Sequence, residues 1–382
     1  MAAYLINKPY GCELMSVDIG IIGLAKSGRT TIFNALTGGE ADTGRYTQEG
    51  SAPHAGIAQV PEPRLQVLTD MLHPKRVVPA SVTYIDIGAS VKDLVKEKGI
   101  GGRLLARLSN VDALINVVRA FSDESIPHVE GNLDIERDIT NMDLELIFSD
   151  LALLERRLEK IAVSLKGAKP PERPGLLREQ ELLTQIKSDL EKDVPIRALR
   201  LTPNEARIMA NYQFLTAKPL LVVANIGEDQ IPQAESLATE LGPHYSRPQC
   251  RLITVCGKLE MELAQLDDSA AEALRAEFGL TGSIVDRIIK LSYELLGLIS
   301  FFTTASAEVK AWSIQSDIEA VKAAGKIHSD MERGFIRAEV ISYDELVKCG
   351  SLSEARKRGL LRLEGKNHIV QDGDVITFLF NV

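Results

Sequence analysis

Short apolar runs alternate with amphipathic stretches through the first 140 residues of the chain and again after residue 205. The runs with strand character are Ile19–Gly23, Val82–Ile87, Ala113–Val118 and Leu220–Ala224. Apolar residues at helical spacing lie between them, as in Gly101–Leu108 and Gln233–Leu241. Strands that alternate with helices form mainly parallel sheets covered on both faces. The pattern therefore predicts an α/β domain.

A heptad-like pattern interrupts this alternation between residues 141 and 200. The apolar positions that step by three and four are Leu144, Ile147, Leu151, Leu154, Leu158, Ile161 and Leu165, followed by Leu176, Leu183, Ile186 and Leu190. Lys166–Gly175, which is rich in Pro and Gly, predicts a turn between the two sets. The pattern predicts an antiparallel coiled coil inserted in the α/β domain. Because heptads specify packing and not partner, the hairpin fits either a scaffold arm or a docking arm for a large partner.

The pattern of apolar and polar residues changes again from about Phe301, where short β-like runs predict a small α+β module. Asp372 and Gly373 stand between two alternating runs, which predicts a β-hairpin. The basic run Arg356-Lys357-Arg358, with Arg362 and Lys366 nearby, forms a modest positive patch. Such a patch fits either an ordinary solvated face or a site of RNA contact.

The loop after the first strand carries the clearest chemical signal. Gly23–Thr30 reads Gly-Leu-Ala-Lys-Ser-Gly-Arg-Thr and fits the phosphate-binding pattern G-x-x-x-x-G-K-[ST], except that Arg29 replaces the lysine. The backbone N–H groups of such a loop and of the following helix form an anion site. The predicted nucleotide contacts are Gly23, Ala25, Lys26, Ser27, Gly28, Arg29, Thr30 and Thr31. The alternative is an ordinary strand-to-helix turn that contains two glycines.

The cations and the metal site follow from the same pattern. Thr30 is expected to place a hydroxyl on Mg²⁺, and Lys26 and Arg29 are expected to neutralise phosphate charge. Arginine keeps the charge of lysine but has a larger, planar head group, so the phosphate chemistry should be altered. Asp86 ends a predicted strand, where an acid holds Mg²⁺ through water. The alternative for Asp86 is a simple turn acid.

Another segment is expected to select the base of the nucleotide. Asn225-Ile226-Gly227-Glu228 follows a strand at the place where GTP-binding domains carry Asn-Lys-x-Asp. Glu228 is one methylene longer than the aspartate that reads guanine, and Ile226 replaces the lysine that covers the base. Adenine therefore becomes the better prediction, with ATP preferred over GTP. Cys256 and Gly257, after a further strand, are expected to close over the base.

Composition narrows the class of protein. The chain has 382 residues, enough for two or three domains, and a net charge of −9, which argues against loose nucleic-acid binding. No apolar run reaches about 18 residues, so no membrane span is predicted. Neither a secretory signal nor a Cys-x-x-Cys pair is present. The scattered cysteines, Cys12, Cys250, Cys256 and Cys349, indicate reduced cytosolic thiols and a cytoplasmic protein. Met15 is a candidate for the true start.

Several motifs, in order, resemble the YchF-type Obg-related ATPases from Met15 onward. They are Gly23–Thr31, Val60–Leu65, Tyr84–Ile87, His128–Gly131, Leu215–Pro219, Asn225–Glu228, Val255–Leu263, Gly325–His328, Glu332–Ile341 and Gln371–Val382. The resemblance implies a Ras-like P-loop NTPase domain, an inserted coiled coil and a C-terminal ubiquitin-like TGS domain. It also implies ATP preference and association with ribosomes. The expected segments are an N-terminal extension (1–15), the nucleotide-binding domain (16–140 and 206–300), the coiled coil (141–205) and the TGS domain (301–382).

The departures from this family lie where hydrolysis happens. The loop differs at Ala25, Lys26, Ser27, Arg29 and Thr30. Ser90 aligns with the hydrophobic catalytic position of the family, and Gly50 aligns with the magnesium-binding threonine of the first switch. Two hypotheses follow. The chain is a slow ATPase switch with Lys26, Arg29 and Ser90 at its catalytic site, or an adaptor that has lost hydrolysis and binds RNA or protein through its coiled coil and TGS domain.

Overall fold

The computed structural model describes residues 17–39, 41, 54–87, 100–245, 249–304 and 307–381. From residue 18 onward, the chain forms two compact units. Unit 1 is drawn from residues 18–56 and 84–285, and unit 2 from residues 57–83 and 286–382. The segment 57–83 thus belongs with the C-terminal part of the chain, although the sequence pattern predicts it within the nucleotide-binding domain. The expected domain boundaries stay a prediction.

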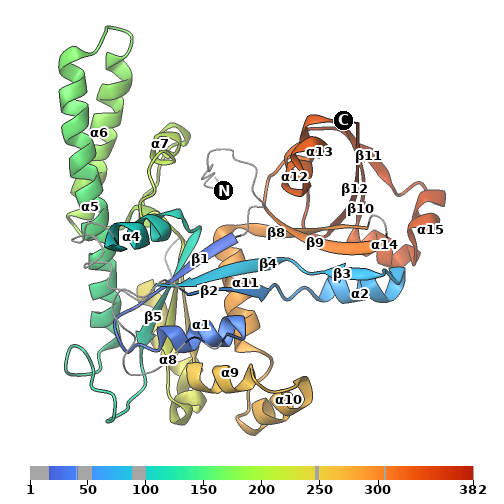
Figure 1. The fold of residues 1–382 in the computed structure, drawn as a ribbon, viewed down its shortest axis with the longest axis horizontal. Helices are drawn as coiled ribbons and strands as arrows, with labels where there is room; N and C mark the ends of the chain where they lie inside the picture. The colour runs from blue at the N-terminus through green and yellow to red at the C-terminus, as the bar shows by residue number, and fades with distance from the viewer. Residues whose placement is uncertain are drawn as a thin grey trace. The chain divides into compact units, whose positions relative to one another are not determined.

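A six-stranded sheet in the order β2-β4-β1-β5-β6-β7 forms the frame of the α/β domain (Figure 1). Its strands are β1 (Val17–Ile22), β2 (His54–Gln59), β4 (Ser81–Asp86), β5 (Ala113–Arg119), β6 (Leu220–Asn225) and β7 (Cys250–Val255). The pairs β1–β5, β5–β6 and β6–β7 are parallel. Every residue of β5 and β6 is buried, as expected of central strands covered on both faces. The predicted α/β architecture is confirmed.

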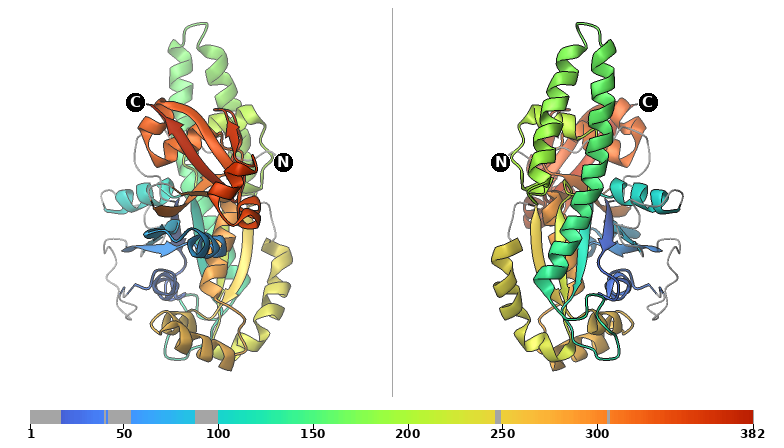
Figure 2. Two further views of the ribbon diagram at one scale, coloured as in Figure 1. Left: turned by 90° about the vertical axis from the view of Figure 1, so that its right-hand side faces the viewer. Right: turned by 90° about the vertical axis from the view of Figure 1, so that its left-hand side faces the viewer.

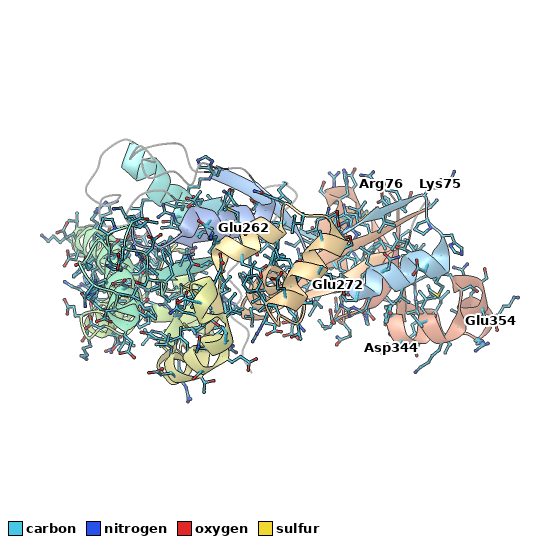
Figure 3. All side chains as sticks on the ribbon, turned by 90° about the horizontal axis from the view of Figure 1, so that it is seen from below. Lys75, Arg76, Glu262, Glu272, Asp344 and Glu354 are labelled. Carbon is cyan, nitrogen blue, oxygen red and sulfur yellow. The ribbon has the colours of Figure 1, made fainter. Side chains whose placement is uncertain are left out.

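The helices of unit 1 follow the strands as the sequence pattern predicts. They are α1 (Arg29–Thr37), α4 (Ile100–Asn110), α5 (Ile135–Gly167), α6 (Arg173–Leu190), α7 (Pro203–Met209), α8 (Ala234–Tyr245), α9 (Gly257–Leu263) and α10 (Asp268–Glu277), with the short 3₁₀ turns η1 (Ile196–Ala198) and η2 (Glu228–Gln233). Charged side chains such as Glu262 of α9 and Glu272 of α10 are exposed on their outer faces (Figure 3).

Helices α5 and α6 form the predicted helical hairpin (Figures 1 and 2). The apolar side chains packed along its seam include Ile147, Leu151, Leu154, Leu158, Ile161, Leu165, Leu176, Leu182, Leu183, Ile186 and Leu190. The turn is shorter than predicted, because helix α5 continues through Gly167. Helix α5 also begins before the expected boundary, and Ile139, Met142 and Leu146 of its first turns pack in the core of the sheet. One helix therefore belongs to both the sheet core and the coiled coil.

A buried carboxylate fixes the middle of α5 to the chain that leads into β6. Asp150 accepts hydrogen bonds from the backbone N–H groups of Leu215 (2.9 Å) and Thr216 (2.8 Å) and from the Thr216 hydroxyl (2.7 Å). Burial raises the pKa of Asp150 to about 6, against the effect of these hydrogen bonds. Nearby, the Lys218 ammonium donates to the carbonyls of Ser109 and Val111. These contacts fix the base of the coiled coil to the sheet.

Unit 2 contains a second six-stranded sheet in the order β11-β10-β12-β8-β9-β3. Its strands are β3 (Arg76–Val78), β8 (Leu298–Thr303), β9 (Glu308–Gln315), β10 (Phe335–Ser342), β11 (Arg362–Glu364) and β12 (Asp374–Phe380). Its helices are α2 (Pro63–Leu72), α11 (Ile284–Leu296), α12 (Ala320–Ile327), α13 (Ser329–Arg333), α14 (Tyr343–Cys349) and α15 (Leu352–Lys357). Side chains such as Phe301, Ile314 and Phe378 form its core. The predicted α+β module is confirmed.

The contacts of Arg64 help to explain why residues 57–83 belong to unit 2. Arg64 donates from Nη1 to the carboxylate of Asp372 (2.7 Å) and from Nη2 to that of Glu62 (2.7 Å). Its guanidinium also lies over the ring of Phe302, 5.5 Å from the centroid. Strand β3 pairs in parallel with β9. The segment is thus held by the backbone pairing of β3 and by the contact of Arg64 with Asp372, which links positions 308 residues apart.

The hairpin predicted at Asp372-Gly373 is wrong. Gly373 does adopt a turn conformation, with φ of 86°. The chain before it, however, forms only an isolated bridge between Ile369 and Glu319. Strand β12 instead pairs with β10, antiparallel, and with β8, parallel. Long-range pairing decided the partner of this strand, and the local turn signal did not.

The predicted basic patch of unit 2 is partly neutralised by acids of the same unit. Arg356 pairs with Glu339 (2.8 Å), and Arg358 pairs with Glu354 (2.8 Å), a residue labelled in Figure 3. Arg362 lies 3.6 Å from Glu364. All three arginines are nevertheless exposed. The patch keeps its accessibility but carries less net charge than the sequence run suggests.

Candidate functional site

The glycine loop joins β1 to α1 and has the shape that an anion site requires. Gly28 has φ of 87° and precedes the first residue of α1. A Cβ on Gly28 would lie 2.1 Å from Asn225 Nδ2, and one on Gly23 would lie 2.4 Å from the Val117 carbonyl oxygen. Both positions therefore require glycine. Within the described part of the chain, no side chain caps the start of α1, so its first N–H groups are available to an anion.

The remaining loop residues differ in accessibility. Lys26 is exposed and has a left-handed backbone, with φ of 64°, and Ala25 is exposed beside it. Ser27 is buried, and Thr31 is half-buried. The backbone carbonyl of Ser27 accepts a hydrogen bond from Asn225 Nδ2.

The structure brings Arg29, Thr30 and Asp86 together across 57 residues of sequence. Arg29 Nε donates to Asp86 Oδ1 (2.6 Å), and the Thr30 hydroxyl donates to Asp86 Oδ2 (2.8 Å). Arg29 Nη1 also donates to the Gly23 carbonyl oxygen (3.1 Å). The guanidinium predicted to face phosphate therefore binds the carboxylate that was predicted to hold Mg²⁺. The side chains of Arg29 and Asp86 are 13% and 4% exposed.

The donor set at this place suits Mg²⁺ in its chemistry. Thr30 offers a hydroxyl oxygen and Asp86 a carboxylate, and Mg²⁺ binds through one or two carboxylates together with substrate phosphates. The described residues contain no group of three or more His, Cys, Asp or Glu side chains that could form a metal cage. A site with so few protein ligands needs the phosphates to complete it. The Arg29 guanidinium already forms an ion pair with Asp86.

Asn225 links three loops that surround the predicted nucleotide. It is 4% exposed, its Nδ2 donates to the Ser27 carbonyl oxygen (3.0 Å), and its Oδ1 accepts from the Gly257 N–H (3.0 Å). The two partners belong to the glycine loop and to the start of α9. Sequence reasoning placed Asn225 at the base. The structure shows that both of its polar atoms hold protein loops in register.

The remaining predicted base contacts separate into exposed and buried groups. Glu228, at the start of η2, pairs with Lys258 of α9 (2.9 Å), and their side chains are 39% and 69% exposed. Ile226 and Cys256 are buried in one apolar cluster. Burial also raises the pKa of the Cys256 thiol. Ile226 is therefore a core residue rather than a cover for the base, and Cys256 offers the site only its backbone.

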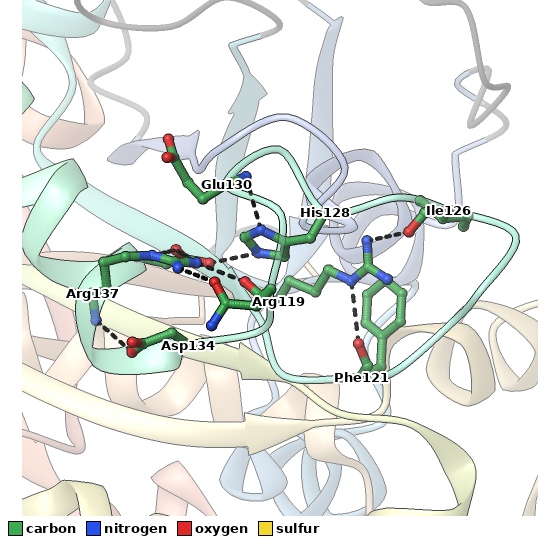
Figure 4. A network of polar contacts seen from close by, with 9 residues as sticks. Arg119, Phe121, Ile126, His128, Glu130, Asp134 and Arg137 are labelled. Carbon is green, nitrogen blue, oxygen red and sulfur yellow. Dashed lines mark hydrogen bonds and ion pairs between the residues drawn. The ribbon is translucent and has the colours of Figure 1, made fainter.

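Sequence reasoning missed a buried polar network behind the glycine loop (Figure 4). His128 Nε2 lies 2.8 Å from Asp138 Oδ2, in the first turn of α5, and Arg137 donates to the same carboxylate. Arg119 donates to the carbonyl oxygens of Ile126 (2.8 Å) and Phe121 (3.2 Å). Burial lowers the pKa of Arg119. His128-Val129-Glu130-Gly131 contributed to the family resemblance, and it was the only sequence signal for this network.

A small cavity separates this network from the glycine loop. Its volume is about 10 Å³. The lining residues are Leu24, Ala25, Ser27, Asn116, Val117, Val118, Arg119, His128 and Asp138. Ser27 Oγ and Asn116 Nδ2 are buried polar atoms with no hydrogen-bond partner among the described residues. The space is close to that of one water molecule. The first turn of the coiled-coil helix thus lies directly behind the glycine loop.

Two predicted positions lie outside the described residues. They are Ser90, the candidate catalytic position, and Gly50, at the expected place of the switch threonine. Among the described residues, no helix is long and apolar enough to cross a membrane. Cys256 and Cys349 are free thiols, and Cys250 is buried.

Two protein-family models match separate parts of the chain. MMR_HSR1, described as a 50S ribosome-binding GTPase, matches residues 18–150. YchF-GTPase_C, described as a protein of unknown function, matches residues 298–381. The first match contains the glycine loop and Asp86, and the second contains most of the sheet of unit 2.

Known proteins align with almost the whole chain. The ribosome-binding ATPase YchF of Bacillus subtilis is 39% identical over 370 residues, which cover 96% of this chain and 100% of the relative. The protein of that name from Escherichia coli O157:H7 is 34% identical over 374 residues, with the same coverage. The solved structure of the Schizosaccharomyces pombe YchF GTPase matches with a TM-score of 0.81 and 28% identity, covering 98% of this chain and 100% of that one.

Proposed function

The chain belongs to the YchF family, and on this premise we propose that it binds ATP at the glycine loop, hydrolyses it and associates with the ribosome. The observation that carries the nucleotide site is the uncapped start of α1 behind a loop with two sterically required glycines. The hydroxyl of Thr30 bonded to Asp86 adds the magnesium-binding pair of P-loop proteins. The relatives' printed names supply the ribosome as partner.

ATP is the preferred nucleotide in this proposal. Glu228 stands where GTP-binding domains carry aspartate, and its side chain is partly exposed near the start of α9. Ile226, in place of the lysine, is buried and leaves the base uncovered on that side. The glutamate and the isoleucine together remove the hydrogen bonds and the covering side chain by which GTP-binding domains recognise guanine. The longer carboxylate of Glu228 remains as a hydrogen-bond acceptor for the base.

Calorimetric titration with ATP and GTP, each with Mg²⁺, tests this preference. ATP should bind more tightly than GTP, and Glu228→Asp should shift the ratio of affinities toward GTP. Glu235→Asp makes the same change on an exposed residue of α8 and should leave the ratio unaltered. Equal or tighter binding of GTP by the unmodified chain would contradict the proposal.

Hydrolysis is proposed to be slow, with Lys26 and Arg29 stabilising phosphate charge and Ser90 at the catalytic position, where the family carries a hydrophobic residue. Catalysis of this type depends on positioning and charge stabilisation. Arg29 is already bound to Asp86 and Gly23, so position 29 does not supply the compact ammonium of the lysine-containing pattern. A turnover below about 1 per second, the low end of kinase-like rates, is expected without a partner. Single-turnover hydrolysis of radiolabelled ATP measures it.

The alternative function is a hydrolysis-deficient adaptor that binds RNA or protein through its coiled coil and C-terminal module. The Arg29–Asp86 pair is the observation that favours it, because this pair occupies the carboxylate of the magnesium site. The two functions give different outcomes in the single-turnover experiment. Product that forms at a slow, protein-dependent rate supports the ATPase, whereas bound ATP recovered intact supports the adaptor.

Four finer assignments belong to this proposal. Mg²⁺ would be held by Thr30 and Asp86 together with the phosphates of the nucleotide. The domain boundaries and the catalytic role of Ser90 are those expected from the sequence. A cytoplasmic location agrees with the free thiols of Cys256 and Cys349.

A further inference from the structure

The Arg29 guanidinium occupies a position with two simultaneous contacts. It meets the Asp86 carboxylate through Nε at 2.6 Å and the Gly23 carbonyl oxygen through Nη1 at 3.1 Å. Gly23 is the first residue of the glycine loop, and Arg29 follows its last residue. The guanidinium therefore connects the two ends of the loop to the end of strand β4. Thr30 occupies the second oxygen of the same carboxylate.

The charge of Asp86 needs a counter-cation because the side chain is almost wholly buried. A buried carboxylate is retained in a protein when a cation pairs with it and hydrogen bonds satisfy its oxygens. In the lysine-containing pattern, Mg²⁺ stands between this acid and the phosphates. Here a guanidinium of the chain itself is the partner. Arginine suits this position because its planar fork binds a carboxylate and a second acceptor at once.

The same guanidinium retains capacity for a phosphate. Arginine carries five N–H donors, and acceptors among the described residues take up donors on Nε and Nη1. Within that same part of the chain, the third nitrogen, Nη2, is left to bind an anion at the loop. The loop itself offers backbone N–H groups and the start of α1. Asp86, Arg29 and a phosphate oxygen would then form a chain of alternating charge without a metal ion.

We propose that Arg29 is a built-in counter-cation at Asp86, so that nucleotide affinity in this chain depends only weakly on Mg²⁺. The inference rests on the proposed binding of ATP at this loop. A lysine at position 29 has one compact ammonium and cannot contact Asp86 and Gly23 in the same fork geometry. Arg29→Lys should therefore leave Asp86 short of positive charge and make Mg²⁺ important for binding.

The test is titration of ATP into the full-length protein, in buffer with Mg²⁺ and in buffer with EDTA. For the unmodified chain, Kd should rise less than about threefold in EDTA, a change well below 1.4 kcal/mol. For Arg29→Lys, Kd should rise more than about tenfold, which is at least about 1.4 kcal/mol. Arg156→Lys makes the same substitution on an exposed residue of α5 and should behave as the unmodified chain.

Each outcome of this titration has a distinct meaning. A tenfold or greater loss of affinity by the unmodified chain in EDTA would overturn the inference and leave nucleotide binding standing. The inference would also be overturned if EDTA left the Kd for ATP unchanged in both Arg29→Lys and the unmodified chain. In that case Arg29 would not be the reason why ATP binding is insensitive to Mg²⁺. If ATP binds in neither buffer, the proposed function fails and the inference with it. Circular dichroism checks folding, and if Arg29→Lys does not fold, the unmodified chain alone decides.

Discussion

At the scale of single residues, the site depends on side chains that each form hydrogen bonds with two separate parts of the protein. Asn225 holds the Ser27 carbonyl oxygen with its amide nitrogen and the Gly257 N–H with its amide oxygen. Arg29 holds Asp86 and Gly23 in a similar way. These residues act within the protein first. Their bonds fix the spacing of the loops before any ligand arrives, which reduces the ordering that binding requires.

Asn225→Ala should lower both stability and nucleotide affinity. The change leaves a buried carbonyl and a buried N–H without partners, at a cost of about 2 kcal/mol in the free energy of unfolding. Asn211→Ala removes an exposed amide at the end of α7 and should change stability by less than about 0.5 kcal/mol. Urea denaturation measures both variants. A stability loss no larger for Asn225→Ala than for Asn211→Ala would contradict the linking role.

At the scale of elements, helix α5 serves two cores. Its first turns pack against the sheet, its later turns pack against α6, and Asp150 lies between the two parts. Three donors from one short segment converge on that carboxylate. The helix is therefore held rigidly at the point where it leaves the sheet. Asp138 of the same helix lines the cavity behind the glycine loop, so one continuous helix joins the surroundings of that loop to the coiled coil.

Asp150→Asn should destabilise the protein by about 3 kcal/mol. The asparagine amide keeps one acceptor oxygen, but its NH₂ group would face N–H and O–H donors and could not accept hydrogen bonds from them. The hydrogen bonds that remain would also be weaker, because those to a charged group contribute more than those to a neutral one. The matched control is Asp193→Asn, on an exposed residue after α6. Thermal and urea unfolding give the difference. If both variants unfold alike, the carboxylate is not the anchor that its three bonds indicate.

At the scale of the whole molecule, the acidic chain offers localised basic groups to a negatively charged partner. The net charge is −9, so contact with ribosomal RNA needs defined positive sites. Arg356, Lys357 and Arg358 form one such site, although acids of unit 2 pair with the two arginines. The tip of the coiled coil forms another, with exposed Lys166, Lys169 and Arg173.

Replacement of Arg356, Lys357 and Arg358 by alanine should weaken co-sedimentation with ribosomes and flatten its salt dependence. Loss of three phosphate contacts should reduce the slope of log affinity against log salt by about 2 to 3. The triple alanine variant of Lys166, Lys169 and Arg173 removes equal charge from the coiled coil and shows which arm carries the contact. If no variant differs from the unmodified chain, or if that chain never pellets in any nucleotide state, the ribosome proposal fails.

The sequence alone determined the elements whose signals are local. Apolar periodicity located the strands and the heptads, and the glycine positions identified the anion loop, because both depend on backbone geometry within a few residues. Asp86 was correctly placed at the end of its strand. The acid, the loop and the base segment were therefore recognised as candidates before their arrangement was known.

Only the tertiary structure decided which of these groups meet. The pairing of Arg29 with Asp86, and of Asn225 with Ser27 across 198 residues, depends on strand order and on the reach of each side chain. The same holds for β12, which pairs with β10 and β8 against the local turn signal. Long-range contacts are set by packing of the whole sheet, and no short sequence window contains that information. The tertiary structure thus added Asp86 as a partner of Arg29, which the sequence had predicted only as a phosphate ligand.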